Sequence, residues 1–127
     1  MKAERDHGLE FLLAFDGLVY VFEEDYRLRF RIGRVRVSER RPHGLSYSLT
    51  LHAPNGVRLV GFDNAHRVGG RRDRHLTTDH WHSALRDAGQ LYAYRDAATL
   101  IDDFLNEVEK VLKDRGVKFD VIREEPK

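Results

Sequence analysis

The chain has 127 residues, of which 41% are hydrophobic and 34% charged, and it contains no cysteine. This length suits one domain with a hydrophobic core, and the composition excludes a disordered or low-complexity chain. The absence of cysteine excludes disulfides, thiolate catalysis, iron–sulfur clusters and cysteine-type zinc sites. No apolar run approaches the roughly 18 residues of a membrane span, and the polar start shows no secretory signal. We therefore expect a cytoplasmic, non-membrane domain.

The net charge of +1 is unevenly distributed along the chain. Residues 1–25 carry a balance of −5 and residues 96–114 a balance of −4, whereas residues 27–74 hold twelve arginines against three acids, a balance of +9. A planar guanidinium group suits phosphate recognition. Genome base composition can raise the number of arginines, but it does not concentrate them in one stretch. The charge distribution therefore indicates a phosphate-bearing or acidic partner.

The N-terminal part contains two apolar runs, Leu9–Phe15 and Leu18–Phe22, separated by Asp16 and Gly17. Periodicity does not distinguish helix from strand in the first run. The second run is β-branched and aromatic, which favours a strand.

The clearest strand signal covers Tyr26–Val37, where apolar residues alternate with arginines. The alternation changes phase after Gly33, and one extra residue there, a β-bulge, would restore both faces. We therefore expect a bent strand with five arginines on one face and an apolar opposite face. Those arginines are Arg27, Arg29, Arg31, Arg34 and Arg36.

Two further strands are expected at residues 45–52 and 57–62, because apolar and polar residues alternate in the first and an apolar run forms the second. Asn55 and Gly56 between them form a strong hairpin signal, since both residue types tolerate positive φ. With the strand at 26–37, these segments predict an antiparallel meander.

The C-terminal half begins with an irregular stretch, Asp63–His82, and a short strand over 91–94. Asp96 is a typical helix N-cap, and a helix with one apolar stripe follows it until Gly116. A final edge strand is expected over 117–122. The sequence thus predicts one α+β domain over residues 1–127, an antiparallel β-sheet (meander) with a C-terminal amphipathic helix packed on one face.

This architecture leaves the arginine-bearing face of the sheet open. Its charges can serve as a solvated surface that discourages edge-to-edge aggregation. They can also bind phosphate groups or an acidic protein partner.

Five of the seven histidines lie between residues 52 and 82, close to the end of a predicted core strand. Polar residues where a strand enters a loop are well placed to form a site on a rigid scaffold. His80 and His82 would point to the same side of an extended segment, with Trp81 on the other side. The candidate catalytic residues are Asp63, His66, His80 and His82, and the candidate substrate- or partner-binding residues are Asn64, Arg27, Arg29, Arg31 and Arg67.

Three interpretations of this cluster remain open. The four candidate catalytic residues could bind a divalent metal as nitrogen and oxygen ligands. The histidines could instead act without metal as base and acid in 2′-OH attack on an RNA phosphodiester, with arginine stabilising the developing charge. In the third, Asp63 and Asn64 make loop-capping hydrogen bonds and the histidines are ordinary loop residues.

Several segments together resemble the TumE family of small bacterial and archaeal toxins. They are Tyr47–His52, then Gly61-Phe62-Asp63-Asn64-Ala65-His66 after a hairpin turn, then Asp79-His80-Trp81-His82 and the C-terminal helix. The resemblance covers roughly residues 26–112. It implies the toxin of a two-gene toxin–antitoxin module, whose DNA-binding antitoxin resembles a winged-helix protein. The resemblance supplies no reaction.

From the residues and the resemblance together, we expect the toxin component of a type II toxin–antitoxin system that acts on RNA through the histidine-rich site as an endoribonuclease. Two alternatives stay open: a non-catalytic binding module that inhibits its target by occupancy, and a metal-dependent hydrolase. The expected partners are RNA and the antitoxin.

Overall fold

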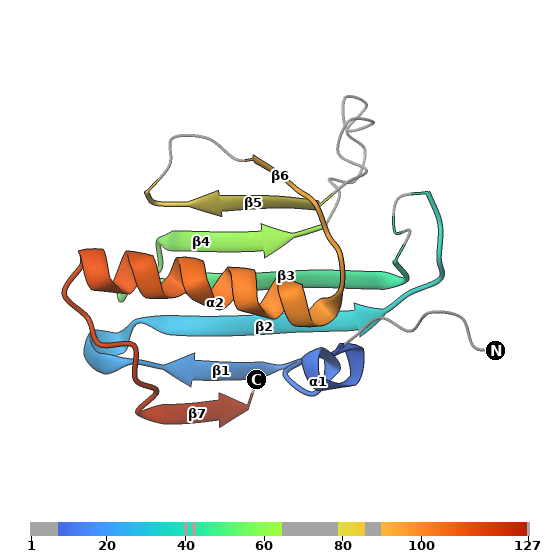
Figure 1. Cartoon of the computed structure of the whole chain (residues 1–127). Coiled ribbons are helices and arrows are strands. Elements are labelled where there is room, and N and C mark those ends of the chain that lie inside the picture. The colour runs from blue at the N-terminus through green and yellow to red at the C-terminus, as the bar shows by residue number, and fades with distance from the viewer. Residues whose placement is uncertain (1–7, 40, 42, 65–78, 86–89, 127) are drawn as a thin grey trace.

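The computed structural model describes residues 8–39, 41, 43–64, 79–85 and 90–126. They form a seven-stranded antiparallel sheet in the order β6-β5-β4-β3-β2-β1-β7, with helix α2 across one face (Figure 1). The predicted α+β class and the meander are confirmed. The elements are α1 (Leu9–Leu13), β1 (Leu18–Val21), a 3₁₀ turn η1 (Glu23–Asp25), β2 (Arg27–Arg34), β3 (Leu45–His52), β4 (Arg58–Asp63), β5 (Asp79–Ser83), β6 (Gln90–Tyr92), α2 (Ala97–Asp114) and β7 (Arg123–Pro126).

The β3–β4 hairpin forms where Asn55 and Gly56 predict it. Gly56 has a φ of 92°, and its backbone N–H donates to the Ala53 carbonyl over 2.8 Å. The Asn55 side chain accepts from the backbone N–H of Val57. The turn residues therefore satisfy the backbone groups that the tight reversal leaves unpaired.

The predicted bulge at Gly33 is wrong. The pairing of β2 with β3 runs without interruption to Arg34, which lies opposite Leu45, and the strand then ends. Arg34 consequently lies on the helix side of the sheet, where its guanidinium pairs with Glu10 of α1 over 2.7 Å. Arg36 lies beyond the strand in the β2–β3 connection. The arginine face of β2 therefore consists of Arg27, Arg29 and Arg31.

Both ends of the chain differ in part from the expectation. The first apolar run forms a short helix, α1, whereas the second forms the predicted strand β1. The final edge strand lies at 123–126 rather than 117–122, and it pairs with β1. The earlier segment is used differently, because Val117 is buried in the core and Phe119 stacks on Phe22.

Helix α2 follows the predicted cap and stripe. The Asp96 side chain accepts from the backbone N–H of Thr99 over 2.8 Å, which satisfies one unpaired donor of the first turn. Phe104 is fully buried against Phe30 and Phe62 of the sheet. Glu107 of α2 is buried and accepts from the Ser83 hydroxyl. Among the described helices none is long and apolar enough to cross a membrane.

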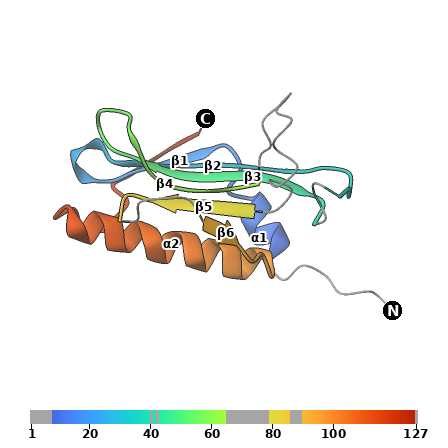
Figure 2. The ribbon, with the colours of Figure 1, turned by 90° about the horizontal axis from the view of Figure 1, so that it is seen from above.

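The two faces of the sheet differ in what covers them. Figure 2 shows α1 and α2 on the same side, with the buried core between the helices and the sheet. No described helix or strand covers the opposite face, which we call the open face. The predicted solvent-facing arginine surface is therefore present, and it forms part of the open face.

Candidate functional site

Strand register places the predicted arginine and histidine residues on the same face. Arg31 lies opposite Ser48, Ser48 opposite Asp63, Asp63 opposite His80, and His80 opposite Leu91. Directly opposed residues in antiparallel strands project from the same face of a sheet. These five residues therefore form one continuous row across the open face, from β2 to β6.

A second row runs beside the first. Arg29 lies opposite Thr50, Thr50 opposite Gly61, and Gly61 opposite His82. Strands in a sheet are about 4.8 Å apart, so three spacings of about 14 Å in all separate the arginines of β2 from the histidines of β5. The two rows thus combine cations, hydroxyl groups, a carboxylate and the imidazoles of His80 and His82.

Arg58 adds a cation that the sequence analysis did not identify. A Cβ atom built on Gly61 would lie only 3.1 Å from Arg58 Nη1, so the Arg58 side chain extends over the Gly61 backbone. The glycine leaves space for a guanidinium group between Thr50 and His82 of the second row. A glycine in the middle of a strand often marks such a close approach, which was the available sequence signal.

The arginines of the open face differ in their partners. Arg27 pairs with Glu125 over 3.1 Å and with Asp25 over 3.6 Å. Within the part of the chain that the structure describes, Arg29, Arg31 and Arg58 have no ion pair. These three guanidinium groups are therefore available to an anionic ligand, whereas Arg27 helps to hold β7.

Two hollows border the arginines of β2. The smaller, of about 190 Å³, is lined by residues of β2 and β3 that include Arg29 and Thr50. The larger, of about 520 Å³, is shallow, and Arg31 and Ser48 line both of them. The smaller hollow, lined by guanidinium and hydroxyl groups, fits a phosphodiester backbone, whereas the larger is also lined by the carboxylate of Asp16.

The candidate catalytic residues are only partly described. His66 and Arg67 lie outside the described residues. Asp63 faces His80 across the β4–β5 pair, and the buried His80 Nε2 has no hydrogen-bond partner among the described residues. Within the described ranges no three acidic or histidine side chains are grouped closely enough to hold a metal ion. A metal site at this position would therefore require at least one ligand from outside the described residues, such as the candidate His66.

Asn64 has a structural partner for each end of its side chain. Its Oδ1 accepts from the Tyr47 backbone N–H over 3.0 Å, and its Nδ2 donates to the Leu45 carbonyl over 2.8 Å. Asn64 is almost completely buried. The side chain thus continues the β3–β4 ladder past the end of β4, as loop capping requires.

A buried tyrosine–carboxylate pair was not predicted. The Tyr47 hydroxyl donates to Asp79 Oδ2 over 2.6 Å, and both residues are buried on the helix side of the sheet. Burial raises the pKa of the Asp79 carboxyl, a shift that the hydrogen bond from Tyr47 and the positive charge of His43 oppose. Burial also raises the pKa of Tyr47. The sequence predicts an irregular stretch around Asp79, whereas Asp79 is the first residue of β5, and that prediction gave no signal for a buried pair.

The raised pKa of Asp79 makes a pH-dependent contribution to stability. The folded chain binds this proton more tightly than the unfolded chain, so the contribution is fully present below the unfolded pKa of about 3.9 and is lost as the pH rises through the folded pKa. We expect Asp79→Asn, which keeps an acceptor for Tyr47, to gain stability relative to the native chain as the pH rises from about 4 to 8. Urea unfolding at several pH values measures this difference, and a constant difference would contradict it.

The fold and the open face define a class: a small α+β domain with one helix-covered apolar face and one exposed face of arginine, hydroxyl and imidazole groups. A family model described as "Toxin TumE" matches residues 7–112. The chain therefore belongs to the TumE toxin family. The matched region ends in the last part of α2, so β7 lies outside it. No curated protein and no solved structure is significantly similar to the chain.

Proposed function

We propose that this toxin acts on RNA in the cytoplasm, as an endoribonuclease whose site lies on the open face. One observation carries the proposal: the two cross-strand rows place Asp63, His80 and His82 on the same face as three arginines without ion-pair partners in the described part. His66 completes the candidate set from the segment that follows β4. A pair of imidazoles beside guanidinium groups suits phosphodiester cleavage, because imidazole side chains can act as base and acid.

The chemistry needs two proton transfers. One imidazole removes the proton from a ribose 2′-OH, and the oxygen attacks the adjacent phosphorus. The bond from phosphorus to the 5′-oxygen breaks, and an imidazolium group gives that oxygen a proton. The products are a 2′,3′-cyclic phosphate and a 5′-hydroxyl end. Asp63, opposite His80 in the register, would orient the imidazole of that residue.

The arginines have a separate role in this proposal. Arg29, Arg31 and Arg58 would bind the phosphates of an RNA strand lying across β2 to β5, beside the hollows along β2 and β3. Backbone binding of this type positions the strand but does not read its sequence.

The direct test is incubation of the purified chain with total RNA, with and without EDTA. We expect cleavage that survives chelation and leaves 5′-hydroxyl ends that polynucleotide kinase labels. Cleavage that EDTA abolishes would instead support the metal-dependent hydrolase, with His66 as a ligand. Binding without cleavage would support the non-catalytic module that inhibits by occupancy.

Charge reversal tests the proposed phosphate contacts. We expect Arg29→Glu and Arg31→Glu each to weaken RNA binding by about tenfold or more and to flatten its salt dependence, because each removes a phosphate contact and adds repulsion. Lys113→Glu makes the same charge change at an exposed position of α2 and serves as the matched control. Filter binding at several salt concentrations measures the effect. Equal losses in all three variants would show that only net charge matters.

The antitoxin is the partner that membership of this toxin family suggests. We propose that it is a DNA-binding protein encoded beside the toxin gene. Co-expression of the neighbouring gene should restore growth to cells that express this chain.

A further inference from the structure

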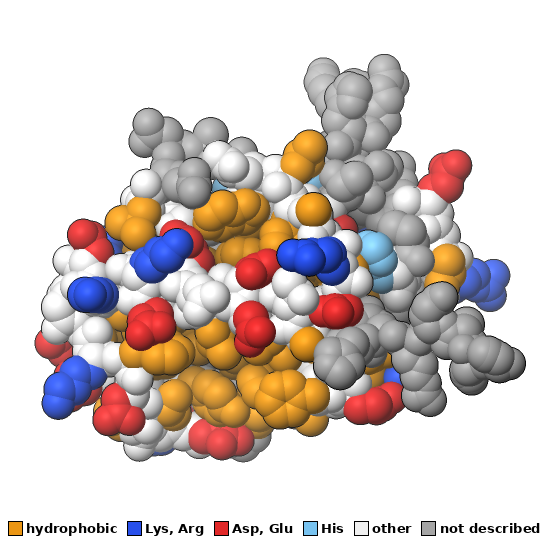
Figure 3. All heavy atoms as spheres, viewed as in Figure 1, with side chains coloured by type: hydrophobic (Ala, Val, Ile, Leu, Met, Phe, Trp, Pro, Cys, Tyr) orange, Lys and Arg blue, Asp and Glu red, His pale blue; other side chains and the backbone are white. Residues whose placement is uncertain are grey.

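The helix side of the sheet has an incompletely covered apolar area beside α2. Phe11, Phe15 and Tyr20 form a chain of edge-to-face ring contacts that continues to buried Phe30, with centroid separations of 4.9–6.0 Å. Phe11 is nevertheless 60% exposed. In Figure 3 this area is the orange surface below the helix. We call Phe11, Phe15, Tyr20 and Leu105 the apolar patch.

Leu105 joins the patch from the helix. A Cβ built on Gly8 would lie 2.9 Å from Ala98 Cβ, so Ala98 marks the side of α2 that meets the N-terminal segment. Leu105 lies seven residues further along, which is two helical turns and hence the same side. It is only partly buried. The patch thus combines residues of α1, α2 and β1 with Phe15 from the α1–β1 connection.

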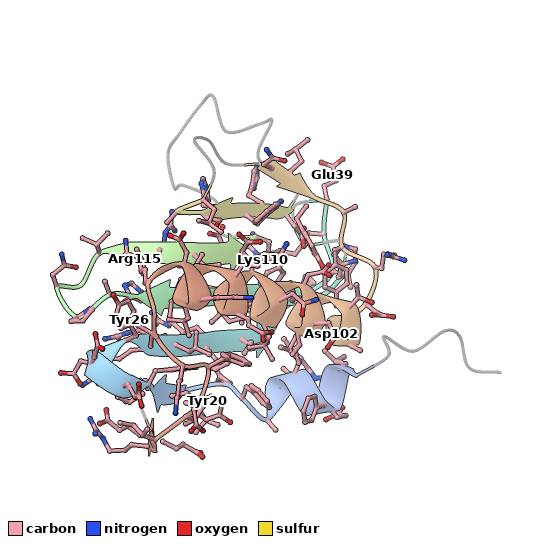
Figure 4. The ribbon with its side chains drawn as sticks, turned by 60° about the vertical axis from the view of Figure 1, so that its left-hand side comes forward. Tyr20, Tyr26, Glu39, Asp102, Lys110 and Arg115 are labelled. Atoms are coloured by element: carbon pink, nitrogen blue, oxygen red, sulfur yellow. The ribbon has the colours of Figure 1, made fainter. Side chains whose placement is uncertain are left out.

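Three acidic side chains border the apolar patch, and the one lysine on that side of α2 is Lys113, a turn beyond Glu109 near the end of the helix. Asp102 and Glu109 are exposed and lie one turn from Ala98 and Leu105 on that side of α2, and Figure 4 shows Asp102 at the edge of the helix near α1. Glu124 of β7 lies opposite Tyr20. An apolar patch bordered by these carboxylates is complementary to an amphipathic helix whose apolar face is flanked by basic residues.

We propose that the apolar patch is the docking site for an amphipathic helix of a partner protein, with leucine-type residues against Phe11, Phe15 and Tyr20 and lysine or arginine beside Asp102, Glu109 and Glu124. A second copy of this chain fits less well, because the carboxylates that border the two patches would repel each other. The patch and the open face lie on opposite sides of the sheet. Partner docking is therefore compatible with a bound RNA and does not depend on the proposed reaction.

Two labelled peptides of about 18 residues test this surface with the purified full-length chain. Both carry leucines at helical spacing, one with lysine flanks and the other with glutamate at every lysine position. We expect the lysine peptide to bind about tenfold more tightly in fluorescence anisotropy and to gain helical circular dichroism on binding. Phe11→Ser should weaken binding of the lysine peptide by about tenfold. Val37→Ser changes a similarly exposed apolar residue in the β2–β3 connection and should leave that binding unchanged.

A charge-swap variant makes the test independent of Phe11. Asp102→Lys combined with Glu109→Lys changes only exposed side chains, and it should reverse the preference towards the glutamate peptide. The proposal fails if the native chain binds neither peptide or both equally well, or if the charge swap leaves the preference unchanged. It also fails if the chain is a dimer that Phe11→Ser dissociates, because a second copy then occupies the patch.

Discussion

Substitution of His82 by alanine is expected to abolish growth inhibition while the fold persists. His82 is half-buried on the open face in the same row as Arg29, and the described structure gives its ring no hydrogen bond that alanine would remove. Loss of a general acid or base lowers a reaction rate by about 10²–10⁴-fold, which is sufficient to remove toxicity. Plating after induced expression measures growth inhibition, and thermal melting of the purified variant checks the fold.

His52 offers a matched control on the same face. Its Nδ1 donates to the Gly56 carbonyl, since a carbonyl can only accept, and its Nε2 is bound to the Thr50 hydroxyl. Both nitrogens have structural partners in the hairpin, so His52→Ala should keep most of the toxicity. Full toxicity of His82→Ala would remove that residue from the site. An equal loss of growth inhibition in both variants would show that toxicity depends on the histidines of the open face generally and not on His82 in particular.

Substitution of Asn64 by alanine should destabilise the fold by about 2–6 kcal/mol. It leaves the buried N–H of Tyr47 and the buried carbonyl of Leu45 without partners, and each unsatisfied group costs about 1–3 kcal/mol. Urea unfolding measures the loss. Asn55→Ala, which removes one exposed side-chain hydrogen bond in the β3–β4 turn, should cost under about 1 kcal/mol.

The stability and the toxicity of Asn64→Ala together distinguish a structural role of Asn64 from a functional one. Asn64 stands beside Asp63 in the segment that resembles the toxin family, and its sequence context alone does not distinguish a capping side chain from a site residue. If Asn64→Ala is as stable as the native chain but no longer inhibits growth, Asn64 belongs to the site. A destabilised variant that keeps its toxicity at low temperature would assign it to the fold alone.

Local patterns in the sequence were sufficient to predict much of the fold. Alternation gave the bounds of β3, and Asp96 and Gly116 marked the two ends of the helix region. The prediction over 26–37 was wrong after Gly33 because it assumed that the alternating residues beyond Gly33 still had a partner strand. The register instead shows that pairing with β3 ends at Arg34, and Val37 is exposed.

The arrangement of the site depended on information that is not local. That Asp63 faces His80 follows from the register in which β4 pairs with β5, and no motif encodes this register. The position of Arg58 over Gly61 depends on side-chain packing across a strand. The Tyr47–Asp79 pair joins residues 32 apart in sequence and required the complete sheet. Residue types predicted the kind of chemistry, and only register brought the groups together.

Cross-linking of RNA to the intact chain tests most directly whether the open face binds the substrate. Purified His82→Ala protein, which should bind without turnover, is irradiated with total RNA and digested, and the linked peptides are identified by mass spectrometry. We expect links on the peptides that contain β2, β3 and β5, which carry Arg29, Arg31 and the histidine pair. Links confined to α2, on the opposite side of the sheet, would contradict the account (Figure 2).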